Sequence, residues 1–170
     1  MINNTIYSYL NTITVNKERR KCLTATEEKR EELVNLWLNS WKKKDNLGIE
    51  KVFAPDVHYI RSWGPEYYVL LEVEYLFNEQ NDRGTIISWE VDRFIHNDDE
   101  TIIHWFLEDE NKTGNGHKIE GLSILKWNKN NQIFFVQDFL CNIHRSDPYS
   151  SSESPIYTEQ QLNWLDKFRK

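Results

Sequence analysis

The segment IEGLSILKWNKNNQIFFVQDF, which spans Ile119 to Phe139, predicts a β-hairpin. Apolar residues recur at about every second position along 118–127 and 133–141, as they do in strands that bury one face. The polar run 128–132 between them has the composition of a turn. We therefore expect the C-terminal part of the folded region to be antiparallel sheet.

The same period of two extends upstream of this hairpin. It predicts strands over 85–95 and 101–108, separated from their neighbours by polar turns over 97–100 and 111–115. Before these strands the pattern is mostly helical, apart from one alternating segment, 57–62, which predicts a further strand.

The first predicted helix begins at Thr24. Thr24 and Glu27 have the spacing of a capping box, in which each residue bonds the backbone of the other. Leu33, Trp37 and Trp41 recur about one turn apart, so they share one face that we expect to be buried.

Proline and glycine mark the expected boundaries of two further helices. Pro55 is expected to end a short helix over 47–53, because proline cannot continue a helix. Gly64 and Pro65 are expected to open a third helix, with Pro65 at the first helical position and Gly84 as the C-cap.

This order of elements predicts an α+β fold. Three helices and a strand precede four strands joined as hairpins, so the helices should cover one face of a curved, mostly antiparallel sheet. A final amphipathic helix is expected to begin at Thr158. We divide the chain into an N-terminal leader (1–23), a folded domain (24–149) and a linker with this C-terminal helix (150–170).

Composition argues against several classes of protein. The chain has 170 residues and a net charge of −6, and an acidic protein is a poor partner for nucleic acid. Its mean hydropathy is −0.72 and it has no long apolar run, so we expect no membrane contact. Cys22 and Cys141 are too few for a disulfide scaffold, and neither they nor the histidines have metal-ligand spacing. We therefore expect a cytoplasmic protein without a metal or other cofactor.

Polar side chains within apolar strands are the candidates for chemistry. Asp138 lies in the most apolar predicted strand, and alternation places it on the same face as Val136 and Leu140. Arg61 lies near the end of the first predicted strand, after Tyr59. A carboxylate on an inward face is either functional or half of a buried structural pair, for which Arg61 and a backbone amide are the candidate partners.

The aromatic residues also allow two interpretations. The chain has 7 Trp, 8 Tyr and 8 Phe, and most of the tryptophans fall at positions that face the core. They can form a packed core, or they can form rigid walls around a pocket for a flat or apolar ligand.

Three features of the sequence resemble the nuclear transport factor 2-like superfamily. They are the first predicted helix, the segment FAPDVHYIRSWGP from Phe53 to Pro65, and the hairpin from Ile119 to Phe139. Within the superfamily they look most like the SnoaL-like branch, which includes small polyketide cyclases and has ketosteroid isomerase as a relative. The resemblance covers about Glu31 to Leu140 and rests on element order and spaced residues.

The resemblance implies a cone-shaped curved sheet, with the three helices packed on its concave face and a pocket at the wide end. Asp138 matches the acidic general base on the last strand of SnoaL-like cyclases. Arg61, Trp37 and Ser123 occupy the positions of the catalytic aspartate, pocket tyrosine and proton-donating aspartate of ketosteroid isomerase. These differences argue against that isomerase's chemistry but imply that the three residues face the cavity. Hairpin register is expected to place Trp105 opposite Ser123.

We therefore expect Asp138 and Arg61 to be catalytic. The expected ligand-binding residues are Trp37, Tyr59, Trp63, Trp105, Ser123 and Leu140. The leading interpretation is a SnoaL-like small-molecule protein, acting as a cofactor-independent cyclase, isomerase or dehydratase on a small apolar or aromatic compound. The alternatives are a non-catalytic binder of such a ligand and a dimeric protein-interaction scaffold.

The resemblance also implies a homodimer that pairs through the convex face of the sheet. His104 and Phe106 are expected on that face. The C-terminal helix is the alternative cover for it.

Overall fold

The computed structural model describes residues 23–141, 147–149, 156–159 and 162–163. Its elements are α2 (Ala25–Lys43), α3 (Ile49–Val52), β1 (Phe53–Ile60), β2 (Glu66–Tyr67), α4 (Leu70–Arg83), β3 (Gly84–Asn97), β4 (Glu100–Asn111), β5 (Gly116–Trp127) and β6 (Ile133–Cys141). The strands form one six-stranded sheet in the order β2-β1-β6-β5-β4-β3. Neighbours are antiparallel except for β1 and β6, which run parallel.

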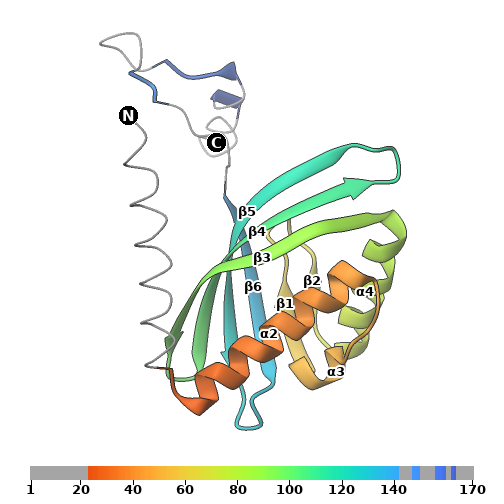
Figure 1. Cartoon of the computed structure of the whole chain (residues 1–170), viewed down its shortest axis with the longest axis vertical. Coiled ribbons are helices and arrows are strands. Elements are labelled where there is room, and N and C mark those ends of the chain that lie inside the picture. The colour runs from red at the N-terminus through yellow and green to blue at the C-terminus, as the bar shows by residue number, and fades with distance from the viewer. Residues whose placement is uncertain (1–22, 142–146, 150–155, 160–161, 164–170) are drawn as a thin grey trace, which may run out of the picture.

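The sheet is curved, and the helices lie on its concave side (Figure 1). Helix α2 crosses the concave face, while α3 and α4 lie beside β1 and β2. The expected α+β cone, with its mostly antiparallel sheet and three helices, is confirmed. No helix within the described ranges is long and apolar enough to cross a membrane.

Helix α2 begins as the sequence predicts. The Thr24 hydroxyl accepts a hydrogen bond from the Glu27 N–H at 3.2 Å, and the Glu27 carboxylate accepts one from the Thr24 N–H at 2.7 Å. This capping box satisfies N–H groups that have no partner within the helix. The helix buries its predicted face, including Leu33, Trp37 and Trp41.

The expected start of the third helix is wrong. Glu66 and Tyr67 pair with β1 as the short strand β2, and α4 begins only at Leu70. Pro65 therefore lies in the turn between two strands, where its carbonyl accepts a hydrogen bond from the Arg61 N–H at 2.9 Å. Gly64 has a φ of +116°, a conformation that favours glycine. Gly84 is the C-cap of α4, as predicted.

Two details of strand pairing also differ from the prediction. Strand β1 starts at Phe53, four residues before the expected start, and the irregular register between Phe53 and His58 accommodates Pro55, which has no N–H to donate. Trp105 pairs with Gly121, and Ser123 pairs with Ile103, so Trp105 does not lie opposite Ser123.

Gly121 is required by this register. The Trp105 ring lies across it, and a Cβ atom on residue 121 would overlap three atoms of the ring. A neighbouring tryptophan therefore occupies the space of the missing side chain.

The predicted leader lies outside the described residues except for Leu23. The C-terminal helix falls partly outside them. Glu159, Leu162 and Asn163 are helical, and the Leu162 N–H donates to the Thr158 carbonyl at 3.0 Å. Residues 164–170, which the prediction includes in that helix, are not described.

We expect Gly121→Ala to destabilise the protein by about 1–3 kcal/mol, because the added methyl group must displace the Trp105 ring. Urea denaturation would measure the loss, and near-ultraviolet circular dichroism would report the changed tryptophan environment. Lys118→Ala, at an exposed position of the same strand, is the control and should cost less. An unchanged denaturation midpoint in Gly121→Ala would contradict the close approach of the Trp105 ring to Gly121.

Candidate functional site

Asp138 lies on the inward face of β6, where its carboxylate is surrounded by hydroxyl groups. The side chain is 5% exposed. Its Oδ1 accepts a hydrogen bond from the Ser123 hydroxyl of β5 at 2.6 Å, and its Oδ2 accepts one from the Tyr59 hydroxyl of β1 at 2.8 Å. Since β6 lies between β5 and β1, strand order brings all three residues to one point.

Arg61 supplies the positive charge beside this carboxylate. Its Nε lies 3.5 Å from Asp138 Oδ2, and its terminal nitrogen Nη1 donates to the Tyr59 hydroxyl at 3.4 Å. The guanidinium also lies 4.1 Å from the ring centre of Trp63, a cation–π distance. Arg61 comes from the β1–β2 turn, so the turn geometry, not a strand, positions it.

Burial and the nearby positive charge shift the pKa of Asp138 in opposite directions. Burial raises the pKa of the carboxyl group, while Arg61 and the hydrogen bonds from Ser123 and Tyr59 lower it, and the net result is a pKa above the ordinary 3.8. Burial raises the pKa of Tyr59 well above its ordinary value, so this phenol remains a hydrogen-bond donor at neutral pH.

A cavity of about 190 Å³ opens directly above this cluster. Asp138 and Arg61 line it together with aromatic and aliphatic side chains from α2, β3, β4, β5 and β6. The other residues that line it are Trp41, Trp63, Gln80, Ile86, Trp89, Trp105, Leu107, Asp109, Ile119 and Leu140. Its size suits a ligand of about one or two rings, because an engineered apolar cavity of about 150 Å³ accepts benzene.

Tryptophan rings form a continuous layer on the floor and one wall of the cavity. The Trp89 ring lies 5.6 Å from Trp105, 6.1 Å from Trp41 and 5.8 Å from Trp37, all at tilted or edge-to-face angles. Trp105 is fixed by its indole N–H, which donates to the Ser123 hydroxyl at 2.8 Å. Rings held in this way cannot collapse into the cavity.

The structure brings the predicted site residues together, but only some of them line the cavity and the others are buried beneath it. Asp138, Arg61, Trp63, Trp105 and Leu140 line the cavity. Trp37, Tyr59 and Ser123 do not line it; they are fully buried beneath it. Tyr59 and Ser123 hold the Asp138 carboxylate from below, and Trp37 supports Trp89.

Several lining residues were missed by the sequence analysis. Trp41 and Trp89 were considered only as part of the whole tryptophan set, for which a packed core and a cavity wall were both left open. Asp109 and Leu107 continue the inward face of β4 from Trp105, so period-two alternation could have found them. Gln80 could not have been found in this way, because the packing of α4 against the sheet decides which part of the helix reaches the cavity.

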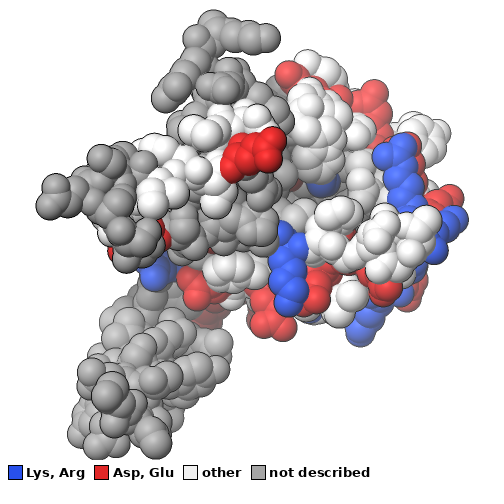
Figure 2. Space-filling model, turned by 90° about the horizontal axis from the view of Figure 1, so that it is seen from above, with Lys and Arg blue, Asp and Glu red and all other residues white. Residues whose placement is uncertain are grey.

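No group of three or more potential metal-ligating side chains is arranged to hold an ion in the part of the chain that the structure describes. On the face seen in Figure 2, basic and acidic residues are interspersed and do not gather into a patch of one sign. The charged and amide groups that line the cavity are the carboxylates of Asp138 and Asp109, the guanidinium of Arg61 and the amide of Gln80; the rest of the lining is aromatic or aliphatic.

Comparisons with known proteins identify the fold. No model of a known protein family matches the sequence. No curated protein matches it either. Among solved structures, an NTF2-like protein of unknown function from Burkholderia xenovorans LB400 superposes with a TM-score of 0.61 at 15% identity, covering 75% of this chain and 94% of that one.

Two further solved structures carry functional names. A candidate isomerase from Bacillus subtilis has a TM-score of 0.61 at 12% identity, covering 69% of this chain and 90% of its own. A candidate SnoaL-like polyketide cyclase from Jannaschia sp. CCS1 has a TM-score of 0.60 at 8% identity, covering 69% of this chain and 89% of its own. The expected resemblance to nuclear transport factor 2-like and SnoaL-like proteins is confirmed at the level of the fold.

The raised pKa of Asp138 predicts a pH-dependent term in stability. Between the ordinary pKa of 3.8 and the raised pKa, the folded state holds a proton that the unfolded chain has released. The contribution of Asp138 to the free energy of unfolding is thus fully present below the ordinary pKa and is lost as pH rises through the folded pKa. Urea denaturation from about pH 3.5 to about pH 8 would measure the free energy of unfolding of the wild type and of Asp138→Asn. The wild-type value minus the variant value should decrease as pH rises through the folded pKa.

Arg61→Leu should move the same loss to higher pH, because it removes the positive charge that lowers the Asp138 pKa. Arg93→Leu, which removes an exposed guanidinium from β3, is the matched control and should leave the profile unchanged. If the Arg61→Leu and wild-type profiles coincide, the pair at 3.5 Å has no energetic role.

Proposed function

We propose that this protein, whose fold is that of nuclear transport factor 2-like proteins, is a cofactor-independent enzyme that removes a proton from a small carbonyl compound. Asp138 is the general base and Arg61 stabilises the charge that develops. The observation that carries the proposal is a buried carboxylate, held by two hydroxyl groups and lining an aromatic cavity.

The environment of Asp138 suits a base. Each carboxylate oxygen accepts one hydrogen bond from the protein and keeps a further lone pair for a substrate proton. A pKa raised by burial makes the ionised carboxylate a stronger base than an exposed one. The substrate proton must still be acidic, as it is on a carbon between two carbonyl groups.

In the proposed step, the C–H bond breaks and its proton moves to Asp138. The electron pair forms a carbon–carbon double bond, and the carbonyl oxygen becomes an enolate oxygen. Arg61 N–H groups then donate to that oxygen. Return of the proton to another carbon gives isomerisation, attack of the enolate on a second carbonyl gives cyclisation, and loss of a β-hydroxyl, protonated as it leaves, gives dehydration.

Two alternatives remain distinct from catalysis. The small cavity and its largely aromatic walls also suit a protein that binds an apolar ligand without transforming it. A protein-interaction scaffold would need neither the cavity nor Asp138. Native mass spectrometry of freshly purified protein would reveal a retained small molecule and so favour ligand binding over the scaffold.

We expect the protein to accelerate the conversion of keto to enol 1-phenylbutane-1,3-dione, a one-ring diketone with an acidic central carbon. Ultraviolet absorbance of the enol follows the reaction. Asp138→Asn should lower the rate constant by about 10²–10⁴-fold, the usual contribution of a general base. Asp56→Asn, an exposed carboxylate on β1, is the matched control and should retain the wild-type rate.

Calorimetric titration of the same diketone separates the alternatives. Binding without acceleration would favour the non-catalytic binder, and no binding would favour the scaffold. Asp138→Asn could also fail to fold, since an unmatched partner in a buried pair costs about 3–5 kcal/mol. Arg61→Leu then supplies a second variant, for which a rate equal to wild type would contradict the proposed enolate stabilisation.

The convex face of the sheet supports a homodimer as part of the proposal. Its outward side chains include Ile102, Phe106, Leu122 and Phe139, each between 37% and 47% exposed. Exposed apolar groups that adjoin one another on a sheet are usually covered by another surface. We also place the protein in the cytoplasm, a location compatible with the free thiol of Cys141.

Light scattering at micromolar concentration should give twice the chain mass of 20.5 kDa. Phe106→Lys should shift the protein to monomer, because it puts a charge in the centre of the pairing face. Leu71→Lys, on the outer face of α4, is an equally exposed control and should leave the mass unchanged. A wild-type mass equal to one chain would contradict the dimer and favour the C-terminal helix as the cover.

A further inference from the structure

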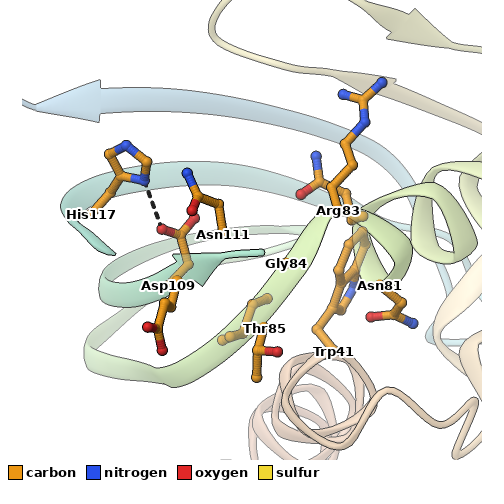
Figure 3. Close-up of a pocket in the computed structure, with 11 residues that line it drawn as sticks. Trp41, Asn81, Arg83, Gly84, Thr85, Asp109, Asn111 and His117 are labelled. Carbon is orange, nitrogen blue, oxygen red and sulfur yellow. Dashed lines mark hydrogen bonds and ion pairs between the residues drawn. The ribbon is translucent and has the colours of Figure 1, made fainter. Parts of the chain in front are cut away.

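A second hollow adjoins the cavity above Asp138. It has a volume of about 110 Å³ and lies where the C-terminal end of α4 meets the ends of β3 and β4 (Figure 3). Trp41, Gln80, Ile86 and Asp109 line both spaces. We call the space above Asp138 the inner cavity and the second space the outer hollow.

Most charged groups at the outer hollow are already paired; the exception among the described residues is Glu110, whose side chain is exposed. Asp109 forms a hydrogen bond with His117 across the strands at 3.0 Å, which Figure 3 shows as a dashed line. Arg83 forms an ion pair with Glu79, and in Figure 3 its side chain extends away from the hollow. Because water screens the exposed Glu110 carboxylate, the outer hollow offers little charge to attract an ion.

Neutral polar groups at the outer hollow are not paired. The side-chain amides of Gln80 and Asn81 and the hydroxyl of Thr85 make no hydrogen bond within the described chain. Gln80 and Asn81 are half-buried at the end of α4, whereas Thr85 is exposed at the start of β3. Polar groups in a partly closed space gain most from a ligand that supplies the missing donors and acceptors.

We propose that the outer hollow is a second binding compartment and that it defines the substrate class. The substrate carries a flat apolar ring for the inner cavity and an uncharged hydrogen-bonding tail, an amide or a hydroxyl, for the outer hollow. This inference rests on the proposed function, because it assumes that the reacting group binds above Asp138. One or two hydrogen bonds from Asn81 and Thr85 to the tail would tighten binding about tenfold.

Calorimetric titration with four phenols that share one ring tests the tail. The probes are 4-methylphenol, which has no polar tail, 4-hydroxyphenylacetamide, which has a neutral one, 4-hydroxyphenylacetate, which has an anionic one, and tyramine, which has a cationic one. We expect the amide to bind about tenfold more tightly than 4-methylphenol, and the two charged phenols to gain nothing.

The double variant Asn81→Leu/Thr85→Val removes hydrogen-bonding groups and keeps similar volumes. It should abolish the advantage of the amide and leave the affinity for 4-methylphenol unchanged. Asn78→Leu, an exposed position on the same helix that lines neither space, is the matched control and should keep the advantage.

The outcomes separate the two proposals. Binding of 4-methylphenol with no advantage for the amide, or with the tightest binding for a charged phenol, overturns the outer compartment and leaves the proposed function standing. An advantage that persists in the double variant also overturns it. Failure of all four phenols to bind at millimolar concentration overturns the outer compartment, whereas the proposed function is overturned only if the diketone is not converted faster.

Discussion

The arrangement of the strands around the cavity depends on the carboxylate of Asp138. It accepts hydrogen bonds from Ser123 of β5 and Tyr59 of β1, and so it joins β6 to both of its neighbours in the sheet. Burying an unpaired carboxylate would cost free energy of folding. The three strands can therefore pack together here only if these hydroxyls and Arg61 lie beside the carboxylate. The cluster thus favours one arrangement of β1 beside β6, which is the parallel pair of the described sheet.

The aromatic layer follows from the same cluster. The Ser123 hydroxyl that donates to Asp138 also accepts a hydrogen bond from the Trp105 indole. That bond orients the Trp105 ring over Gly121, where no side chain competes for the space. Trp89 packs on Trp105 and in turn contacts Trp41 of α2. A polar contact in the sheet therefore determines the position of rings that reach the helix on the other side of the cavity.

These contacts also explain why the cavity stays open and chemically competent. Much of its wall consists of aromatic rings that have few accessible rotamers and contact one another edge to face. These contacts prevent the rings from rotating into the cavity. Burial raises the pKa of the Asp138 carboxyl group and Arg61 lowers it, so the balance between the two sets its proton affinity. Arg61 and Trp63 come from a turn and Asp138 from a strand, so the cavity combines one rigid side with one side whose geometry depends on a short loop.

The sequence by itself determined the local features of this protein. Alternation along β4, β5 and β6 identified the strands and the inward face of Asp138, and the Thr24–Glu27 spacing identified the start of α2, because these signals depend only on neighbouring residues. Tertiary structure alone decided the rest. Pro65 lies in a turn because β2 pairs with β1. Trp105 lies opposite Gly121 because the register depends on the partner strand. Gln80 lines the cavity because of the way α4 packs against the sheet. Such relations join residues far apart in the chain, and no local period encodes them.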